Sequence, residues 1–220
     1  MSKMKELKKI IVNKPLKLDC GETIINYPIA YETYGKLNEK KDNAILAFHA
    51  LTGDQFLTGI NPVTNKKGWW TYLIGPSKPI DTNKFFVICA NVIGGCMGSF
   101  GPSTVDEKSK KPLGTSFPVI TINDMVNAQY NLLDHFKIKK LFCVIGGSMG
   151  GMQVLQFVSN FPNAAKNAIP IACTANHSAQ NIAFNELARQ SIMADNNWDK
   201  GDYVNKEKSP DKGLAVARMA

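Results

Sequence analysis

The chain has 220 residues, of which 44% are hydrophobic and 20% charged, and its formal net charge is +8. This length favours one domain, or one domain with an elaboration, and the composition allows a sizeable buried core. No apolar run approaches the roughly 20 residues that span a bilayer. The N-terminus is rich in lysine but has only a short apolar run, 10–12, before Asn13 and Lys14, so we expect no signal peptide and a cytoplasmic protein.

The distribution of charge and cysteine argues against an acidic macromolecular partner and for the cytosol. Lysines gather at 40–41, 108–111 and 137–140 with acidic residues nearby, and no regular aromatic interleaving accompanies them. We interpret these segments as solvated loops and expect neither a nucleic-acid nor a membrane partner. The five cysteines lack Cys-x-x-Cys spacing, so we expect reduced and mostly buried thiols. They are Cys20, Cys89, Cys96, Cys143 and Cys173.

In chain order, the first predicted elements are an N-terminal arm and the strands of a sheet. The arm covers 1–15, and 16–35 reads as two strands around a turn at Gly21, typical of the antiparallel edge of a sheet. Short apolar runs then follow that are typical of buried parallel strands. They are 44–48, 85–90, 141–145 and 168–172.

Helical patterns separate the later strands. Apolar residues recur at helical spacing over 123–136 and 149–161, and the first helix follows a Thr-x-x-Asp start at Thr121–Asp124. Helices that alternate with continuously apolar strands indicate a mostly parallel, doubly wound α/β sheet.

The pattern changes after Thr174. A helix is predicted over 178–195, a polar stretch follows, and 213–220 begins a helix that no capping residue closes. We therefore divide the chain into an N-terminal arm over 1–15, an incomplete core over 16–176 and the start of a helical cap over 177–220. We also expect the chain to be truncated at its C-terminus.

Ser148 stands in the run Gly146-Gly-Ser-Met-Gly150, between a predicted strand and a predicted helix. A Gly-x-Ser-x-Gly motif in this context is a nucleophile elbow, where glycines are needed because a Cβ would collide with neighbouring backbone. We predict that Ser148 is a catalytic nucleophile, the alternative being a plain glycine-rich turn. One oxyanion donor would be the N–H of Met149, and our candidate for the other is the N–H of Leu51.

A serine nucleophile also needs a base. His49 and His135 precede Ser148, and no acid lies between Ser148 and His177, so these residues cannot complete the order serine, acid, histidine. We expect a structural role for His49 and a solvated position for His135, whereas His177 could approach the site.

Several runs together make the sequence similar to the homoserine O-acetyltransferase family of methionine biosynthesis, the acyl-transferring branch of the α/β-hydrolase fold. In the family's order they are 30–38, 49–54, 91–104, 146–153, 183–186 with 189–190, and 213–219. The resemblance implies ping-pong transfer of an acetyl group from acetyl-CoA, a co-substrate, to the hydroxyl of L-homoserine through an acyl-Ser148 intermediate. It implies no cofactor and no metal.

The resemblance also assigns a role to Arg189, which would bind the acceptor, since a guanidinium can clamp a carboxylate bidentately. The alternative for Arg189 is a surface position. The family's triad Asp and His would lie beyond residue 220, so we expect the 220-residue chain by itself to be inactive. For the full-length protein we expect a homodimer.

The sequence departs from the family pattern at Gln55-Phe56 and at Phe100, and both changes could alter the acyl or acceptor pocket. A succinyl donor therefore stays an alternative, as do a serine esterase or hydrolase of the same fold and a non-catalytic binding module. The glycine-rich loop over 91–104 could cradle phosphates, although such loops more often serve backbone geometry. Cys96 in that loop is expected to be a small buried thiol rather than a second nucleophile.

Overall fold

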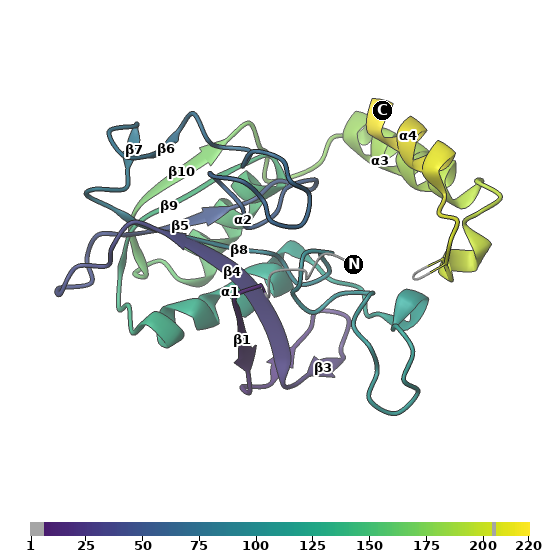
Figure 1. Ribbon diagram of the computed structural model, residues 1–220, viewed down its shortest axis with the longest axis horizontal. Coiled ribbons are helices and arrows are strands. Elements are labelled where there is room, and N and C mark those ends of the chain that lie inside the picture. Colours follow the sequence, from purple (N-terminus) through teal and green to yellow (C-terminus); the bar gives the residue numbers. More distant parts are fainter. Residues whose placement is uncertain (1–6, 204–205) are drawn as a thin grey trace. The chain divides into compact units, whose positions relative to one another are not determined.

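The computed structural model describes residues 7–203 and 206–220, which form two compact units (Figure 1). The first unit runs to Phe100 and resumes over Val119–Cys173, and the second comprises Gly101–Pro118 and Thr174–Ala220. The first unit thus differs from the core predicted over 16–176. The reason is that the 3₁₀ turn Gly114–Ser116 packs against the 3₁₀ turn Asp199–Gly201 of the C-terminal segment.

A six-stranded sheet with the order β1-β4-β8-β5-β9-β10 forms the centre of the first unit. Strands β8, β5, β9 and β10 are parallel, whereas β4 is antiparallel to both β8 and β1. The predicted mostly parallel α/β sheet with an antiparallel N-terminal edge is confirmed. The bounds are β1 Lys9–Val12, β4 Tyr27–Tyr34, β5 Ala44–Phe48, β8 Phe86–Ala90, β9 Leu141–Gly147 and β10 Ala165–Ile171.

Strand β1 corrects the prediction of an N-terminal arm over 1–15. Lys9–Val12 pairs along its whole length with Tyr27–Ala30, and Val12 is buried in the core. Backbone pairing with β4 and burial of one side chain therefore fix a segment whose composition suggested fraying. Residues 1–6 of the predicted arm lie outside the described residues.

Side chains of the central strands alternate between two layers, because successive residues of a strand point to opposite faces. On one face, α1 (Ile122–Phe136) and α2 (Met149–Asn160) bury residues such as Leu46 and Phe48. On the opposite face, Ile45 and Ala47 pack beneath a segment that contains β6 (Ile74–Gly75) and β7 (Ile80–Asp81). Figure 1 shows β6 and β7 on one side of the sheet and α1 on the other.

The start of α1 follows its sequence signal. The Thr121 hydroxyl accepts a hydrogen bond from the N–H of Asp124 at 3.2 Å, and the Asp124 carboxylate accepts one from the N–H of Thr121 at 2.9 Å. This reciprocal capping box satisfies two N–H groups that a helix start would otherwise leave unpaired. Lys137 ends the helix in the left-handed conformation, at φ 54°. A separate pair of short strands, β2 (Leu16–Lys17) and β3 (Thr23–Ile24), lies before β4 in the chain.

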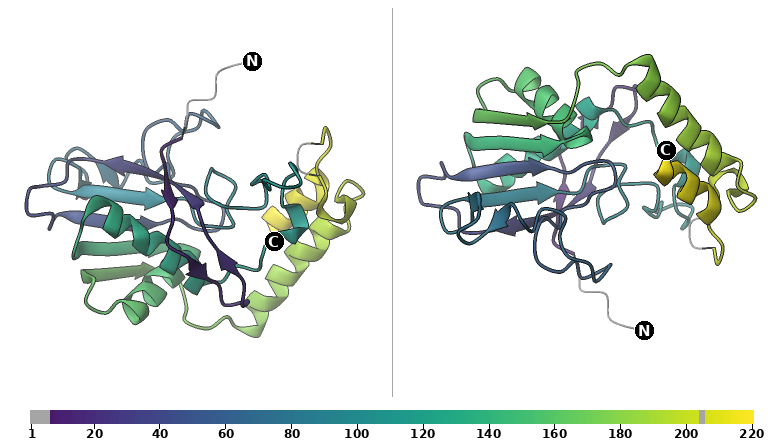
Figure 2. Two further views of the ribbon diagram at one scale, coloured as in Figure 1. Left: turned by 90° about the horizontal axis from the view of Figure 1, so that it is seen from below. Right: turned by 90° about the horizontal axis from the view of Figure 1, so that it is seen from above.

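The second unit is built on α3 (Ala179–Met193) and α4 (Asp211–Met219), which pack against each other (Figure 2). A Cβ at Gly213 would lie 2.3 Å from the carbonyl oxygen of Ser191, so the two helices approach through a glycine. The Asp195 carboxylate accepts a hydrogen bond from the N–H of Gly213 at 2.8 Å. No residue of α3 is buried. Among the described residues, no helix is both long enough and apolar enough to cross a membrane.

Candidate active site

Ser148 lies at the sharp turn between β9 and α2, in a backbone conformation that non-glycine residues rarely adopt. Its φ is 55° and its ψ is −122°, and its N–H donates to the carbonyl of Ile171 at 3.0 Å. Such conformations cost about 1–3 kcal/mol and persist where the surroundings impose them. Ser148 is exposed and its side chain makes no capping hydrogen bond to α2, so the hydroxyl is free to meet a substrate.

Two glycines of the motif are required by close backbone contacts, as predicted. A Cβ at Gly146 would lie 2.4 Å from the carbonyl carbon of Gly150, and one at Gly150 would lie 2.2 Å from the carbonyl oxygen of Phe48. Real Cβ atoms do not approach backbone so closely. By contrast, a Cβ at Gly147 would meet nothing within 4 Å. The first turn of α2 therefore rests directly on the end of β5.

This packing places the predicted oxyanion donors at the same edge of the sheet. Met149 begins α2, and the N–H groups of a first helical turn have no intrahelical acceptor. Leu51 lies in the loop that follows β5, and its N–H donates to no acceptor within the described part of the chain. Both N–H groups are therefore available to an oxyanion that forms on a substrate carbonyl.

A buried glutamine that the sequence analysis missed joins α2 to this loop. Gln153 is fully buried, and its side-chain amide donates to the carbonyl of His49 at 3.2 Å and to that of Met149 at 3.3 Å. The Gln153 side-chain oxygen accepts a hydrogen bond from the amide of Gln129 in α1 at 2.7 Å. In the sequence, Gln153 stands out only because it is a polar residue on an otherwise apolar face of the helix.

His49 has a structural role, in agreement with the sequence. Its Nε2 accepts hydrogen bonds from the N–H of Val92 at 3.1 Å and the amide of Asn91 at 3.3 Å, which leaves Nδ1–H to donate to the carbonyl of Ala50 at 2.7 Å. Burial of the ring lowers the pKa of His49. A neutral ring with both nitrogens engaged cannot take a proton from Ser148.

The other two histidines are exposed. His135, near the end of α1, has its Nε2 3.4 Å from the hydroxyl of Tyr31, as expected of a solvated ring. His177 precedes α3, and its Nδ1 lies 3.4 Å from the amide of Asn185. Within the described residues, no histidine forms a hydrogen bond with Ser148.

Arg189 lies on α3 in the second unit. Its Nε donates to the Glu186 carboxylate at 3.0 Å, and a second guanidinium nitrogen also contacts that carboxylate. Hydrogen bonds from Gln190 and then from Arg189 lower the pKa of Glu186. The Arg189 side chain is 60% exposed, so this pair adds little to stability. The guanidinium is nevertheless accessible to a ligand carboxylate.

The glycine-rich loop after β8 is organised around Asn91. The Asn91 side-chain oxygen accepts a hydrogen bond from the N–H of Met97 at 3.0 Å, and a Cβ at Gly95 would lie 2.7 Å from that same oxygen. Backbone geometry thus accounts for this glycine. Held in this way, the loop exposes Cys96, so the expectation of a buried Cys96 is wrong. The expectation of mostly buried cysteines is wrong as well, because Cys20 is also exposed and only Cys89 and Cys143 of the five are buried.

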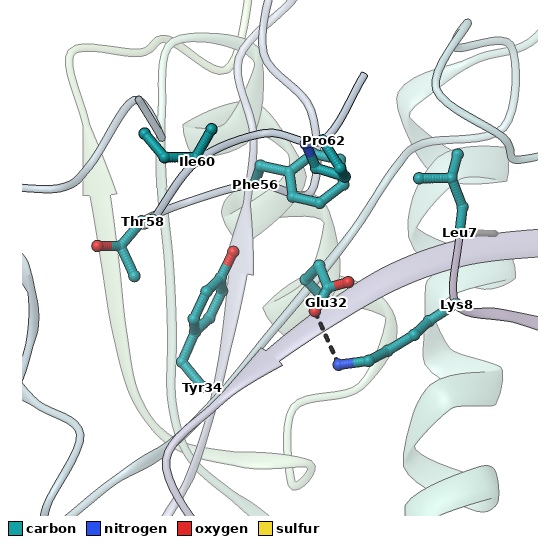
Figure 3. A pocket seen from close by; sticks show the side chains of 9 residues that line it. Leu7, Lys8, Glu32, Tyr34, Phe56, Thr58, Ile60 and Pro62 are labelled. Carbon is teal, nitrogen blue, oxygen red and sulfur yellow. Dashed lines mark hydrogen bonds and ion pairs between the residues drawn. The ribbon is translucent and has the colours of Figure 1, made fainter. Parts of the chain in front are cut away.

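A hollow of about 450 Å³ lies elsewhere in the first unit (Figure 3). Figure 3 shows Phe56 and Pro62 above it, with the Lys8 ammonium turned toward the Glu32 carboxylate, and the structure gives this ion pair a length of 2.8 Å. The hydroxyl of Tyr34, which also lines the hollow, donates to the carbonyl of Gln55 at 3.2 Å. None of the residues predicted for catalysis lines this hollow.

Comparisons with known proteins agree with this geometry. Residues 43–220 match the family model of the alpha/beta hydrolase fold. The chain is 73% identical over 214 residues to a homoserine O-acetyltransferase of Pelagibacter ubique (strain HTCC1062). The aligned region covers 97% of this chain and 58% of that protein. It is 60% identical over 208 residues to a homoserine O-acetyltransferase of Mesorhizobium japonicum, with 94% and 54% covered. The chain thus spans somewhat more than half the length of these relatives.

Solved structures with the same fold include two kinds of enzyme. The crystal structure of esterase E22 superposes with a TM-score of 0.87 and 33% identity, covering 97% of this chain and 60% of that one. The structure of a homoserine O-acetyltransferase from Bacillus anthracis gives a TM-score of 0.85 and 31% identity, with 96% and 58% covered. In both cases the similarity extends over nearly all of this chain.

Proposed function

The chain belongs to the alpha/beta hydrolase fold family, and from this premise we propose that the whole protein transfers an acetyl group from acetyl-CoA to L-homoserine. The observation that carries the proposal is the exposed Ser148 on its strained elbow, a geometry suited to forming an acyl-serine. Relatives 73% and 60% identical that bear the name homoserine O-acetyltransferase support the choice of substrates.

In this reaction the Ser148 hydroxyl attacks the thioester carbonyl of acetyl-CoA. The N–H groups of Met149 and Leu51 would stabilise the negative charge on the carbonyl oxygen, and the tetrahedral intermediate collapses as the thiol of CoA leaves with a proton. The hydroxyl of homoserine then attacks acetyl-Ser148 and releases O-acetylhomoserine, which regenerates the serine. This sequence is a ping-pong mechanism.

We further propose that the base which takes the Ser148 proton is supplied from outside these 220 residues. Both ring nitrogens of His49 are engaged in hydrogen bonds, and no acidic residue stands between Ser148 and His177. The elbow enzymes of this fold carry their acid and histidine after the nucleophile. Without that base, Ser148 stays a weak nucleophile and only the oxyanion donors contribute to the rate.

Arg189 is the proposed anchor for the acceptor. Its guanidinium is accessible and could exchange Glu186 for the α-carboxylate of homoserine, which a planar fork binds bidentately. We also propose a cytoplasmic location, which the five free cysteines support.

Esterase activity is the second candidate, since the similarity to esterase E22 covers nearly all of this chain. A transferase and a hydrolase differ in whether an alcohol or water reaches the acyl-enzyme. Hydrolysis would proceed at the same rate with and without homoserine, whereas transfer requires it.

The decisive experiment uses the full-length protein with acetyl-CoA alone, then with L-homoserine, and compares succinyl-CoA as donor. We expect mass spectrometry to find one acetyl group on the peptide that contains Ser148, and homoserine to discharge it as O-acetylhomoserine. Ser148→Ala should abolish both steps and reduce turnover by about three orders of magnitude or more. Substantial turnover in that variant, or an acetyl group on another residue, would contradict the proposal.

A further inference from the structure

Lysines from three separate segments surround a hollow of about 300 Å³ in the first unit, which we call the lysine groove. Two of the segments precede β5 and β9, and the third is at the start of β10, so the groove lies at the amino-terminal edge of the parallel strands. Ser148 follows the carboxyl end of β9, at the opposite edge. The lining lysines are Lys40, Lys41, Lys137, Lys139, Lys140 and Lys166, and the lining acids are Glu39 and Asp42.

The positive charges of the groove are only partly neutralised by the protein. Six lysines and two acidic residues line the groove, and none of the six lysines forms an ion pair of 4 Å or less within the described residues. Asp42 accepts a hydrogen bond from the Asn38 amide at 2.7 Å, and this bond and then the nearby Lys166 and Lys40 lower its pKa. By contrast, Lys8 and Glu32 neutralise each other in the hollow of Figure 3, at 2.8 Å.

Hydrogen-bonded backbone fixes the walls of the groove. The N–H of Lys137 donates to the carbonyl of Asp134 at 3.0 Å, and the N–H of Lys41 donates to that of Asn38 at 3.0 Å. The ammonium of Lys41 donates to the carbonyl of Phe136 at 3.0 Å, which ties the two walls together. The six lysines outnumber the two carboxylates of the groove, so their positive charges repel one another, and a bound anion would relieve this repulsion.

The residues that line the groove also restrict its ligand. None is aromatic and none is arginine, so the groove offers no surface on which a nucleobase could stack and no planar fork for a carboxylate. Lysine binds phosphate as a point charge, and several lysines around a small hollow favour several negative charges in a small volume. We propose that the lysine groove binds a compact polyanion with two or more phosphate groups, of the pyrophosphate or tripolyphosphate class.

This site is independent of the proposed acetyl transfer, and its test requires no turnover. Calorimetry with the full-length protein would measure binding of tripolyphosphate, and of sulfate for comparison, at constant ionic strength. The triple variant Lys139→Gln, Lys140→Gln, Lys166→Gln removes three groove charges. The matched control Lys14→Gln, Lys66→Gln, Lys67→Gln removes three charges from exposed lysines that do not line the groove.

We expect tripolyphosphate to bind more tightly than sulfate. The groove variant should weaken tripolyphosphate binding by about tenfold or more, or about 1.4 kcal/mol. The control variant should change the affinity for tripolyphosphate by about twofold or less. Equal weakening by both variants would overturn the proposal in favour of diffuse net charge. Tighter binding of a single-stranded oligonucleotide than of tripolyphosphate would also overturn it. If the triple variant does not fold, Lys40→Gln with Lys137→Gln tests the same groove with the same criteria.

Discussion

The elbow around Ser148 and the pair of helices α3 and α4 both depend on a glycine pressed against backbone, yet their surroundings differ. At the elbow, Gly150 meets the end of a fully buried strand, and Gln153 beside it is fully buried and hydrogen-bonded. In the second unit, Gly213 meets α3, a helix with no buried residue. A close contact therefore constrains the backbone strongly only where the surrounding core prevents either side from moving.

The largest effect on stability is expected at the elbow. Gly150→Ala would place a Cβ 2.2 Å from the carbonyl oxygen of Phe48, and neither β5 nor α2 can move without opening the core. We expect a loss of about 3 kcal/mol or more in the free energy of unfolding, measured with urea. Gly147→Ala is the matched control, because its Cβ meets nothing within 4 Å. Its effect should stay within about 1 kcal/mol, and similar losses in the two variants would contradict this account.

A smaller effect is expected from the glycine of the second unit. Gly213→Ala would place a Cβ 2.3 Å from the carbonyl oxygen of Ser191. Because α3 is not buried, the helices can separate slightly, and we expect a loss of about 1–2 kcal/mol. Hydrogen exchange of α3 and α4 should increase while that of β5 stays unchanged. A loss as large as that of Gly150→Ala would show that the comparison between the two regions is wrong.

Acid should lower the free energy of unfolding through His49. Burial lowers the pKa of His49 in the folded protein below its ordinary value of 6.5, so the unfolded chain binds the proton first as pH falls. The stabilising contribution is complete above about pH 6.5 and declines below it, by at most about 1.4 kcal/mol per pH unit. Urea unfolding at pH 7.5, 6.5 and 5.5 should show this slope.

His49→Gln should flatten that slope, whereas His135→Gln, at an exposed ring, should leave it unchanged. If the free energy of unfolding of the His49 variant fell with acid as in the unmodified protein, the assignment to His49 would be wrong.

The smallest effect on stability is expected at Arg189. Arg189→Lys keeps the charge but loses the fork that contacts Glu186, and the free energy of unfolding should change little because the pair is exposed. If Arg189 binds the acceptor carboxylate, KM for homoserine should rise by about tenfold while acetylation by acetyl-CoA is unchanged. Equal damage to both half-reactions would indicate a structural role instead.

The sequence by itself determined those features whose causes lie within a few residues of one another. The Gly-x-Ser-x-Gly run predicted the turn at Ser148 because Gly146 packs against the backbone of Gly150, four positions along the chain. The capping box of Thr121 and Asp124 predicted the start of α1 for the same reason. Continuous apolar runs likewise predicted the buried strands β5, β8 and β9, since burial on both faces excludes polar residues. The prediction of a buried strand over 168–172 is wrong on burial, because most of that run lies in β10, whose residues are mostly exposed.

Only the tertiary structure decided the features that join distant segments. Gln153 and His49 are 104 positions apart, and their hydrogen bond exists only because α2 packs on the end of β5. The sequence does not predict strand β1, because its stability comes from pairing with β4 rather than from its own composition. The sequence predicts separate solvated loops for the lysines because no local pattern relates 40–41 to 137–140. They meet in one groove because parallel strands bring their amino-terminal ends to the same edge of the sheet.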